Sequence, residues 1–216
     1  VLSQVVFRIK PSVHAAYRAQ EDTVGTSIIS VYNTLNGVET QTSAALVRSS
    51  ATVLTPLIAE VGGACAPWVA GCRVKSIDGN GLEASEHRLK ALRTVQAGAL
   101  PGKTLVVFAP AHGLVTEVFP CEDGHAQERA LFGAVLETVG ADDLWMADRN
   151  FCPCGLLWGI DTRKAFFLIR QHEDLAYERC SPWRSSGRME TGQVSEQRSR
   201  VWDAQGRRFT EESFEG

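Results

Sequence analysis

The chain has 216 residues and a formal net charge of −3, with 44% hydrophobic and 22% charged residues. This length is enough for one or two domains with a core, and the composition is that of a globular protein. The sequence has no apolar run long enough to cross a membrane, and its start lacks the basic-then-apolar layout of a signal peptide. We therefore expect a cytoplasmic protein.

The first part of the chain is expected to be helical. Over residues 12–62 apolar side chains recur at spacings of three and four residues, the period of a helix, and Gly62 and Gly63 form a stop signal. Pro56 is expected to start a new helix or to kink the existing one. We assign residues 1–72 to an N-terminal helical region.

From residue 73 the pattern changes to strands alternating with helices. The expected elements are a strand RVKSID ending at Asp78, a hairpin of strands 103–110 and 113–120, a helix over 125–139, a buried strand DLWMAD, a short helix in 151–163 and a buried strand 165–171. Parallel pairing of the DLWMAD strand with the RVKSID strand, through a right-handed crossover, is the usual solution for this order. The expected class is α/β with a mixed sheet over residues 73–172, and after Tyr177 the polar sequence indicates exposed strands or a hairpin.

Two aspartates follow apolar strands, in VKSIDGN and in LWMADRN. Taken singly, Asp78 followed by Gly79 is a typical turn dipeptide, and Asp148 could cap the helix that follows it. Taken together, they end neighbouring parallel strands, so their carboxylates are expected at the same edge of the sheet. Such a pair favours a bound cation, and oxygen ligands favour Mg²⁺ or Mn²⁺. With a third carboxylate, it could hold the two metals of a phosphoryl displacement.

The same blocks resemble a known family. SIDGNGLEASEHRLKALR, FPCEDGHAQERALF, LWMADRNFC and AFFLIRQH, in this order, are similar to bacterial insertion-sequence DDE transposases of the IS-four family. The resemblance covers most of residues 12–208 and implies a ribonuclease H-like fold. It also implies DNA as partner, at terminal inverted repeats and at a target, with nicking and strand transfer, and a homodimer in the synaptic complex. By this resemblance Asp78 and Asp148 are the first two acids of the catalytic triad and metal ligands, and residues 1–72 are a candidate for binding DNA ends.

The sequence departs from the family at the third acid. In the family a glutamate lies in a Y-x2-R-x3-E-x6-K helix after a β-rich insertion, and that motif does not occur here. We interpret residues 173–216 as the beginning of the insertion, and the chain as a truncated transposase with little or no activity of its own. Basic side chains near the two aspartates could contact DNA phosphates or form a solvated surface: these are Arg88, Lys90, Arg93 and Arg149.

Three other interpretations stay open at this point. A ribonuclease H-like nuclease could complete its site with another acid, for example Glu83 or Glu173. The chain could instead be a catalytically dead DNA-binding module that uses its N-terminal helices, or a pseudogene product without a selected role. A zinc site is a weaker possibility, because its candidate ligands match no standard zinc-finger spacing: Cys152, Cys154, His172 and Cys180.

Overall fold

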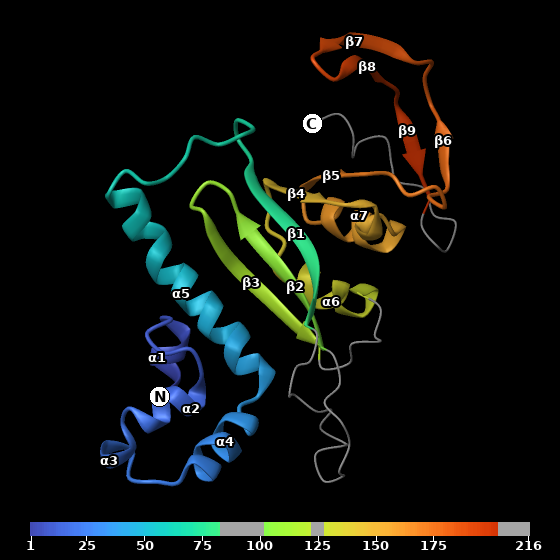
Figure 1. Ribbon diagram of the computed structural model, residues 1–216. Helices are drawn as coiled ribbons and strands as arrows, with labels where there is room; N and C mark the ends of the chain where they lie inside the picture. The colour runs from blue at the N-terminus through green and yellow to red at the C-terminus, as the bar shows by residue number, and fades with distance from the viewer. Residues whose placement is uncertain (83–101, 122–127, 203–216) are drawn as a thin grey trace.

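The computed structural model describes residues 1–82, 102–121 and 128–202, apart from the side chains of Val6 and Leu82. Five helices come first, a five-stranded mixed sheet with helices against it follows, and two small antiparallel ribbons come last (Figure 1). The expected mixed α/β class is therefore confirmed. In the described part of the chain no helix is both long and apolar enough to span a membrane.

The N-terminal helical region is also as predicted. Its helices are α1 (Leu2–Val6), α2 (Val13–Arg18), α3 (Glu21–Val24), α4 (Ile28–Asn36) and α5 (Thr40–Glu60). Two serines stabilise helix starts in the usual way: the Ser12 hydroxyl accepts from the backbone N–H of Ala15, and the Ser27 hydroxyl accepts from that of Ser30.

Helix α5 excludes one of the two alternatives expected for Pro56, the start of a new helix. Pro56 lies inside the helix, which does not restart there, so the missing N–H costs one helical hydrogen bond without ending the element. The predicted stop is correct, because the helix ends at Glu60 and Gly62 adopts the left-handed φ of 71° that glycine tolerates.

The central sheet has the strand order β3-β2-β1-β4-β5. Its strands are β1 (Arg73–Leu82), β2 (Gly102–Ala109), β3 (Leu114–Cys121), β4 (Asp143–Ala147) and β5 (Phe166–Ile169). The predicted hairpin is confirmed, since β2 and β3 are antiparallel neighbours, and so is the parallel pairing of β1 with β4. Strand β5 adds a second parallel pair on the far side of β4.

Two strand predictions need correction. Strand β1 does not end at Asp78 and Gly79, because it continues to Leu82 along its antiparallel partner β2; only its parallel pairing with β4 stops, after Ser76. Strand β5 is not buried on both faces. It lies at the end of the strand order, and Phe166 and Leu168 are 44% and 60% exposed.

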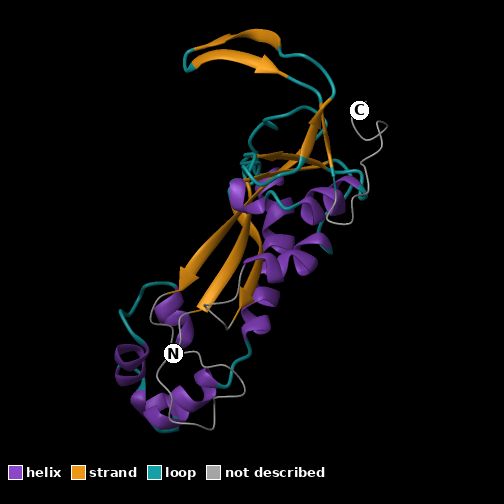
Figure 2. Cartoon of the chain, turned by 90° about the vertical axis from the view of Figure 1, so that its right-hand side faces the viewer, coloured by secondary structure: helices purple, strands orange, loops and turns teal. Residues whose placement is uncertain are grey.

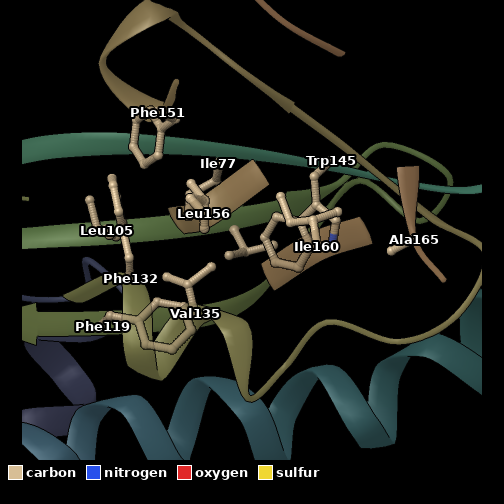
Figure 3. Packing of buried hydrophobic residues seen from close by; sticks show 11 residues of the cluster. Ile77, Leu105, Phe119, Phe132, Val135, Trp145, Phe151, Leu156, Ile160 and Ala165 are labelled. Atoms are coloured by element: carbon tan, nitrogen blue, oxygen red, sulfur yellow. The ribbon is translucent and has the colours of Figure 1, made fainter. Parts of the chain in front are cut away.

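One face of the sheet is covered by a helical layer. The predicted helix over 125–139 is found in two pieces within the described residues, the 3₁₀ turn η2 (Glu128–Leu131) and α6 (Phe132–Leu136). Beyond β4 come η3 (Arg149–Phe151) and α7 (Cys154–Asp161). Figure 3 shows the core between these layers, with side chains from β1, β2 and β4 packed against α6 and α7: Ile77, Leu105, Trp145, Phe132, Val135, Leu156 and Ile160.

A buried carboxylate fixes the beginning of the parallel strand pair. Asp143 is fully buried, and it accepts hydrogen bonds from Arg73 Nε at 2.9 Å, Lys75 Nζ at 2.8 Å and Gly140 N at 2.8 Å. The Lys75 ammonium also lies over the Trp145 ring, 5.0 Å from its centroid. Because a buried charge is tolerated only when it is paired, this network holds β1 and β4 in register.

Helix α5 packs along β3, with Ala44 and Ala51 buried in the contact. The Arg48 guanidinium donates to both oxygens of the Glu117 carboxylate, with Nε at 3.1 and 2.9 Å. The hydrogen bond to Glu117, and then its negative charge, raise the pKa of Arg48. The bidentate pair therefore ties the helical region to the edge strand.

The C-terminal part forms two ribbons, as the polar sequence predicted. Strands β6 (Tyr177–Arg179) and β9 (Ser199–Val201) pair beside the body, while β7 (Arg184–Met189) and β8 (Gly192–Glu196) form a projecting hairpin (Figure 2). Every residue of the hairpin strands is exposed.

Candidate functional site

The two predicted aspartates lie at corresponding positions of neighbouring strands. The parallel register pairs Lys75 with Trp145 and Ser76 with Met146, where it ends. Continued by two residues, the same register sets Asp78 opposite Asp148. The topology thus brings both residues to the point where the parallel pairing of β1 and β4 stops: Asp148 directly follows β4, and Asp78 lies four residues before the end of β1.

Each carboxylate makes one local hydrogen bond. Asp78 Oδ1 accepts from the backbone N–H of Gly79 at 2.8 Å, and Asp148 Oδ1 accepts from that of Asn150 at 2.9 Å. The second bond caps the 3₁₀ turn η3, whereas the predicted helix in 151–163, α7, begins after Pro153 and is not capped by Asp148. Both side chains are exposed, and neither forms an ion pair with another described residue. Among the described residues, the second oxygen of each carboxylate is therefore without a hydrogen-bond partner.

Strand alternation assigns the aspartates to one face of the sheet. Ile77 and Trp145 face the helical core, so Asp78 and Asp148, one and three positions further on, belong to the opposite face. On that face Phe166 and Leu168 of β5 remain exposed. The two carboxylates therefore lie on the more open face of the β1–β4–β5 half of the sheet.

A third carboxylate near this point was missed by the sequence reasoning. The Glu128 side chain of η2 lies so close to Gly79 that a Cβ there would contact it. Gly79 follows Asp78 in the strand, so the position a side chain would take at Gly79 is on the helical face. Glu128 thus approaches β1 from the side opposite to Asp78. Its only sequence signal is the polar start of the 125–139 helix, which does not reveal this contact.

Of the remaining predicted residues, some lie among the residues that the structure describes and the others do not. Arg149 is exposed directly after Asp148, and Glu173 is exposed beyond the end of β5. The others fall outside the described residues: Glu83, Arg88, Lys90 and Arg93.

Residues 1–82, 102–121 and 128–202 contain no group of three or more His, Cys, Asp or Glu side chains that could hold a metal ion. The zinc-site possibility at Cys152 and Cys154 therefore has no support from this part of the chain. Cys152 is instead a buried thiol that packs with Leu157 and Val201 below the β6–β9 ribbon. The carboxylates of Asp78 and Asp148 are oxygen donors, the type of ligand that Mg²⁺ and Mn²⁺ prefer over zinc.

No family model, no curated protein and no solved structure matches this chain. A functional assignment therefore depends on Asp78 and Asp148, on the parallel register of β1 and β4, and on the family resemblance of the sequence blocks.

Proposed function

We propose that this chain is part of a DDE-type DNA transposase with a ribonuclease H-like core, in which Asp78 and Asp148 supply two of the metal-binding acids. The observation that supports the proposal most directly is the parallel register of β1 and β4, which, continued by two residues, sets the two aspartates opposite each other just beyond the end of the parallel pairing. The sheet order β3-β2-β1-β4-β5, with only β2 antiparallel to its neighbours, agrees with the fold that the resemblance implies.

The chemistry of the two residues fits a divalent cation. Two exposed carboxylates on adjacent strands repel each other unless a cation lies between them, and neither has a Lys or Arg partner among the described residues. When bound, Mg²⁺ or Mn²⁺ activates the attacking water or 3′-hydroxyl and stabilises the leaving oxygen in an in-line displacement. In hydrolysis the water oxygen bonds to phosphorus and the bond to O3′ breaks, which releases a 3′-hydroxyl. The role of Asp78 and Asp148 is to hold and orient the cation.

We expect DNA to approach these exposed carboxylates from the face of the sheet on which they lie. Arg149 follows Asp148 directly and is exposed, so its guanidinium is a candidate for a phosphate contact. Because a phosphate contact carries no sequence information, its loss should weaken binding to all DNA sequences by a similar factor and reduce the salt dependence.

The proposal is tested by titrating Mn²⁺ into the chain by calorimetry. The parent should bind Mn²⁺, and Asp78→Asn and Asp148→Asn should each abolish binding, because either change removes half of the ligand pair. Asp22→Asn is the matched control: Asp22 is an exposed aspartate of α3, and its loss should leave binding unchanged. Far-ultraviolet circular dichroism of each variant confirms that the fold is retained.

Three results would count against the proposal. Equal Mn²⁺ binding by the parent and Asp78→Asn would show that the aspartates do not bind the metal. No binding by a folded parent would show that this chain alone has no cation site. If the chain binds a DNA repeat sequence in the presence of a metal chelator, and neither substitution changes this binding, the alternative of a catalytically dead DNA-binding module would be favoured.

A further inference from the structure

A cavity of about 130 Å³ lies between α7, the end of β5 and the β6–β9 ribbon (Figure 1). Its floor is formed by three buried side chains: Cys152, Leu157 and Val201. Phe167 and Ile169 of β5 form a wall. An apolar cavity of about 150 Å³ can take up benzene, so this cavity has roughly the volume that one aromatic ring requires.

The mouth of the cavity is polar. Gln171 and Tyr177 also line the cavity, and both are exposed, so they mark its opening to solvent. Hydrogen bonds with Arg179 and then with Gln171, together with the positive charge of Arg179, lower the pKa of Tyr177 from its usual value. Three polar side chains therefore converge where the apolar cavity meets water, an arrangement that is typical of small-molecule sites.

The register of the ribbon directs one cation to the cavity. Its strands pair Tyr177 with Val201 and Arg179 with Ser199. Paired residues, and residues two apart along a strand, lie on the same face of a ribbon. Arg179 therefore shares a face with the three other residues, all of which line the cavity. Glu178, the acidic residue of these two strands, belongs to the opposite face. The face toward the cavity thus carries a positive charge and no acid from either strand.

We propose that this cavity binds a small organic acid, with an apolar body about the size of an aromatic ring in the cavity and its carboxylate beside Arg179. The floor and wall remove the apolar body from water, while the carboxylate stays at the mouth, where Arg179 and Gln171 can donate to it. Because the lining comes from both the sheet and the ribbon, the bound acid holds the β6–β9 ribbon against β5.

The cavity is separate from the candidate cation site. Phe167 pairs with Trp145, which faces the helical core, so the cavity lies on the helical side of the sheet. Asp78 and Asp148 belong to the opposite face. The inference therefore goes beyond the DNA chemistry and does not depend on it.

The test is a titration of the full chain with sodium benzoate, followed by the backbone amide signals in ¹H–¹⁵N NMR spectra. Benzoate should shift the amides of β5, β6 and β9, with a dissociation constant of about 1 mM, as expected for so small a ligand. Benzamide has the same ring without the charge and should bind about tenfold more weakly. Acetate has the charge without the ring and should shift none of these amides.

Three variants separate the carboxylate contact from the cavity. Arg179→Gln should weaken benzoate binding about tenfold and leave benzamide binding unchanged, because only benzoate uses the positive charge. Arg188→Gln removes an exposed arginine of the projecting hairpin; it is the matched control and should bind benzoate like the parent. Cys152→Leu places a larger side chain on the floor and should abolish the binding of both ligands, while the urea midpoint stays at or above that of the parent.

Several results would overturn the proposal. If about 10 mM benzoate shifts none of these amides, the site does not exist. Equal binding of acetate and benzoate would leave only an anion contact on the surface, and an equal loss in Arg188→Gln would show a general effect of charge. Unchanged benzoate binding by Arg179→Gln would exclude the carboxylate contact, and unchanged binding by a folded Cys152→Leu would exclude the cavity. The ligand series and Arg179→Gln decide the proposal even if Cys152→Leu is unstable. None of these readouts involves metal or DNA, so they can fail or succeed independently of the transposase proposal.

Discussion

Removal of the buried Asp143 carboxylate should cost more stability than any change at the exposed aspartates. Asp143→Ala leaves Lys75, whose side chain is 21% exposed, without its anion, and leaves the Gly140 N–H without an acceptor. Breaking one side of a buried charge pair typically costs about 3–5 kcal/mol. Arg73 is 66% exposed and can turn to water, and Lys75 keeps a bond to the Thr138 carbonyl, so we expect about 3 kcal/mol.

Asp143→Asn separates charge from hydrogen bonding. Its carbonyl can still accept from Lys75 and Gly140, which leaves only the solvent-exposed Arg73 facing the amide group. We expect a smaller loss, about 1–2 kcal/mol.

Urea unfolding followed by circular dichroism measures both losses as a change in midpoint at constant slope. Asp142→Asn is the control, since Asp142 is exposed and asparagine tolerates its left-handed φ of 64°. A loss below about 1 kcal/mol for Asp143→Ala would refute the argument that this network fixes the β1–β4 register.

Two further predictions concern the projecting hairpin and the contact behind Asp78. The hydrogen bond from Arg184, then that from a neighbouring serine and the charge of Arg184, lower the pKa of Glu196 from its usual 4.5. The stabilisation of the hairpin is therefore present above pH 4.5 and is lost as the pH falls through the lowered pKa. The protection of the β7–β8 amides, measured relative to the intrinsic exchange rate at each pH, should decrease there. Glu196→Gln should remove this pH dependence, and constant protection in the parent would contradict the prediction. Gly79→Ala should lower the free energy of unfolding in urea by less than about 1 kcal/mol, because the added methyl displaces only the flexible end of Glu128. This loss should vanish in a Glu128→Ala background. A large loss that persists there would mean that the backbone, not Glu128, is the obstacle.

The order of the elements could be predicted from the sequence because it depends on local periodicity. The run DLWMA is apolar at almost every position, which indicates a strand between two neighbours, and β4 is indeed paired on both sides. The parallel partnership of β1 and β4 followed from the usual handedness of crossovers. The two aspartates were found in the same way, as polar residues at the end of apolar strands.

The end of β1 could not be predicted, because it is decided by a partner strand that is distant in sequence. Asp78 and Gly79 are strong turn residues, yet β2 pairs with both and carries the strand on. The contact of Glu128 with Gly79 has the same origin. Likewise, FFLI reads as a buried strand, whereas its place at the end of the strand order exposes Phe166 and Leu168, a property of the sheet rather than of the segment.

The continuation of β1 beyond Asp78 also bears on the candidate site. At a turn, a carboxylate could point in many directions, whereas in a paired strand its face is fixed by alternation. Asp78 is paired antiparallel with Val106 of β2, which thus fixes the face of the sheet on which its side chain lies. On its other side, the pairing with β4 has already ended. Asp148 sits where β4 gives way to η3, and its cap to Asn150 limits its rotation. The parallel pairing of β1 with β4 stops after Ser76, while β1 continues along β2 to Leu82. If the two carboxylates hold one cation, as we propose, we expect it to reach them from the face that carries Phe166 and Leu168, opposite to α6 and α7. Substitutions on that face next to the two aspartates should then affect cation binding, while substitutions in the helical core should affect stability first.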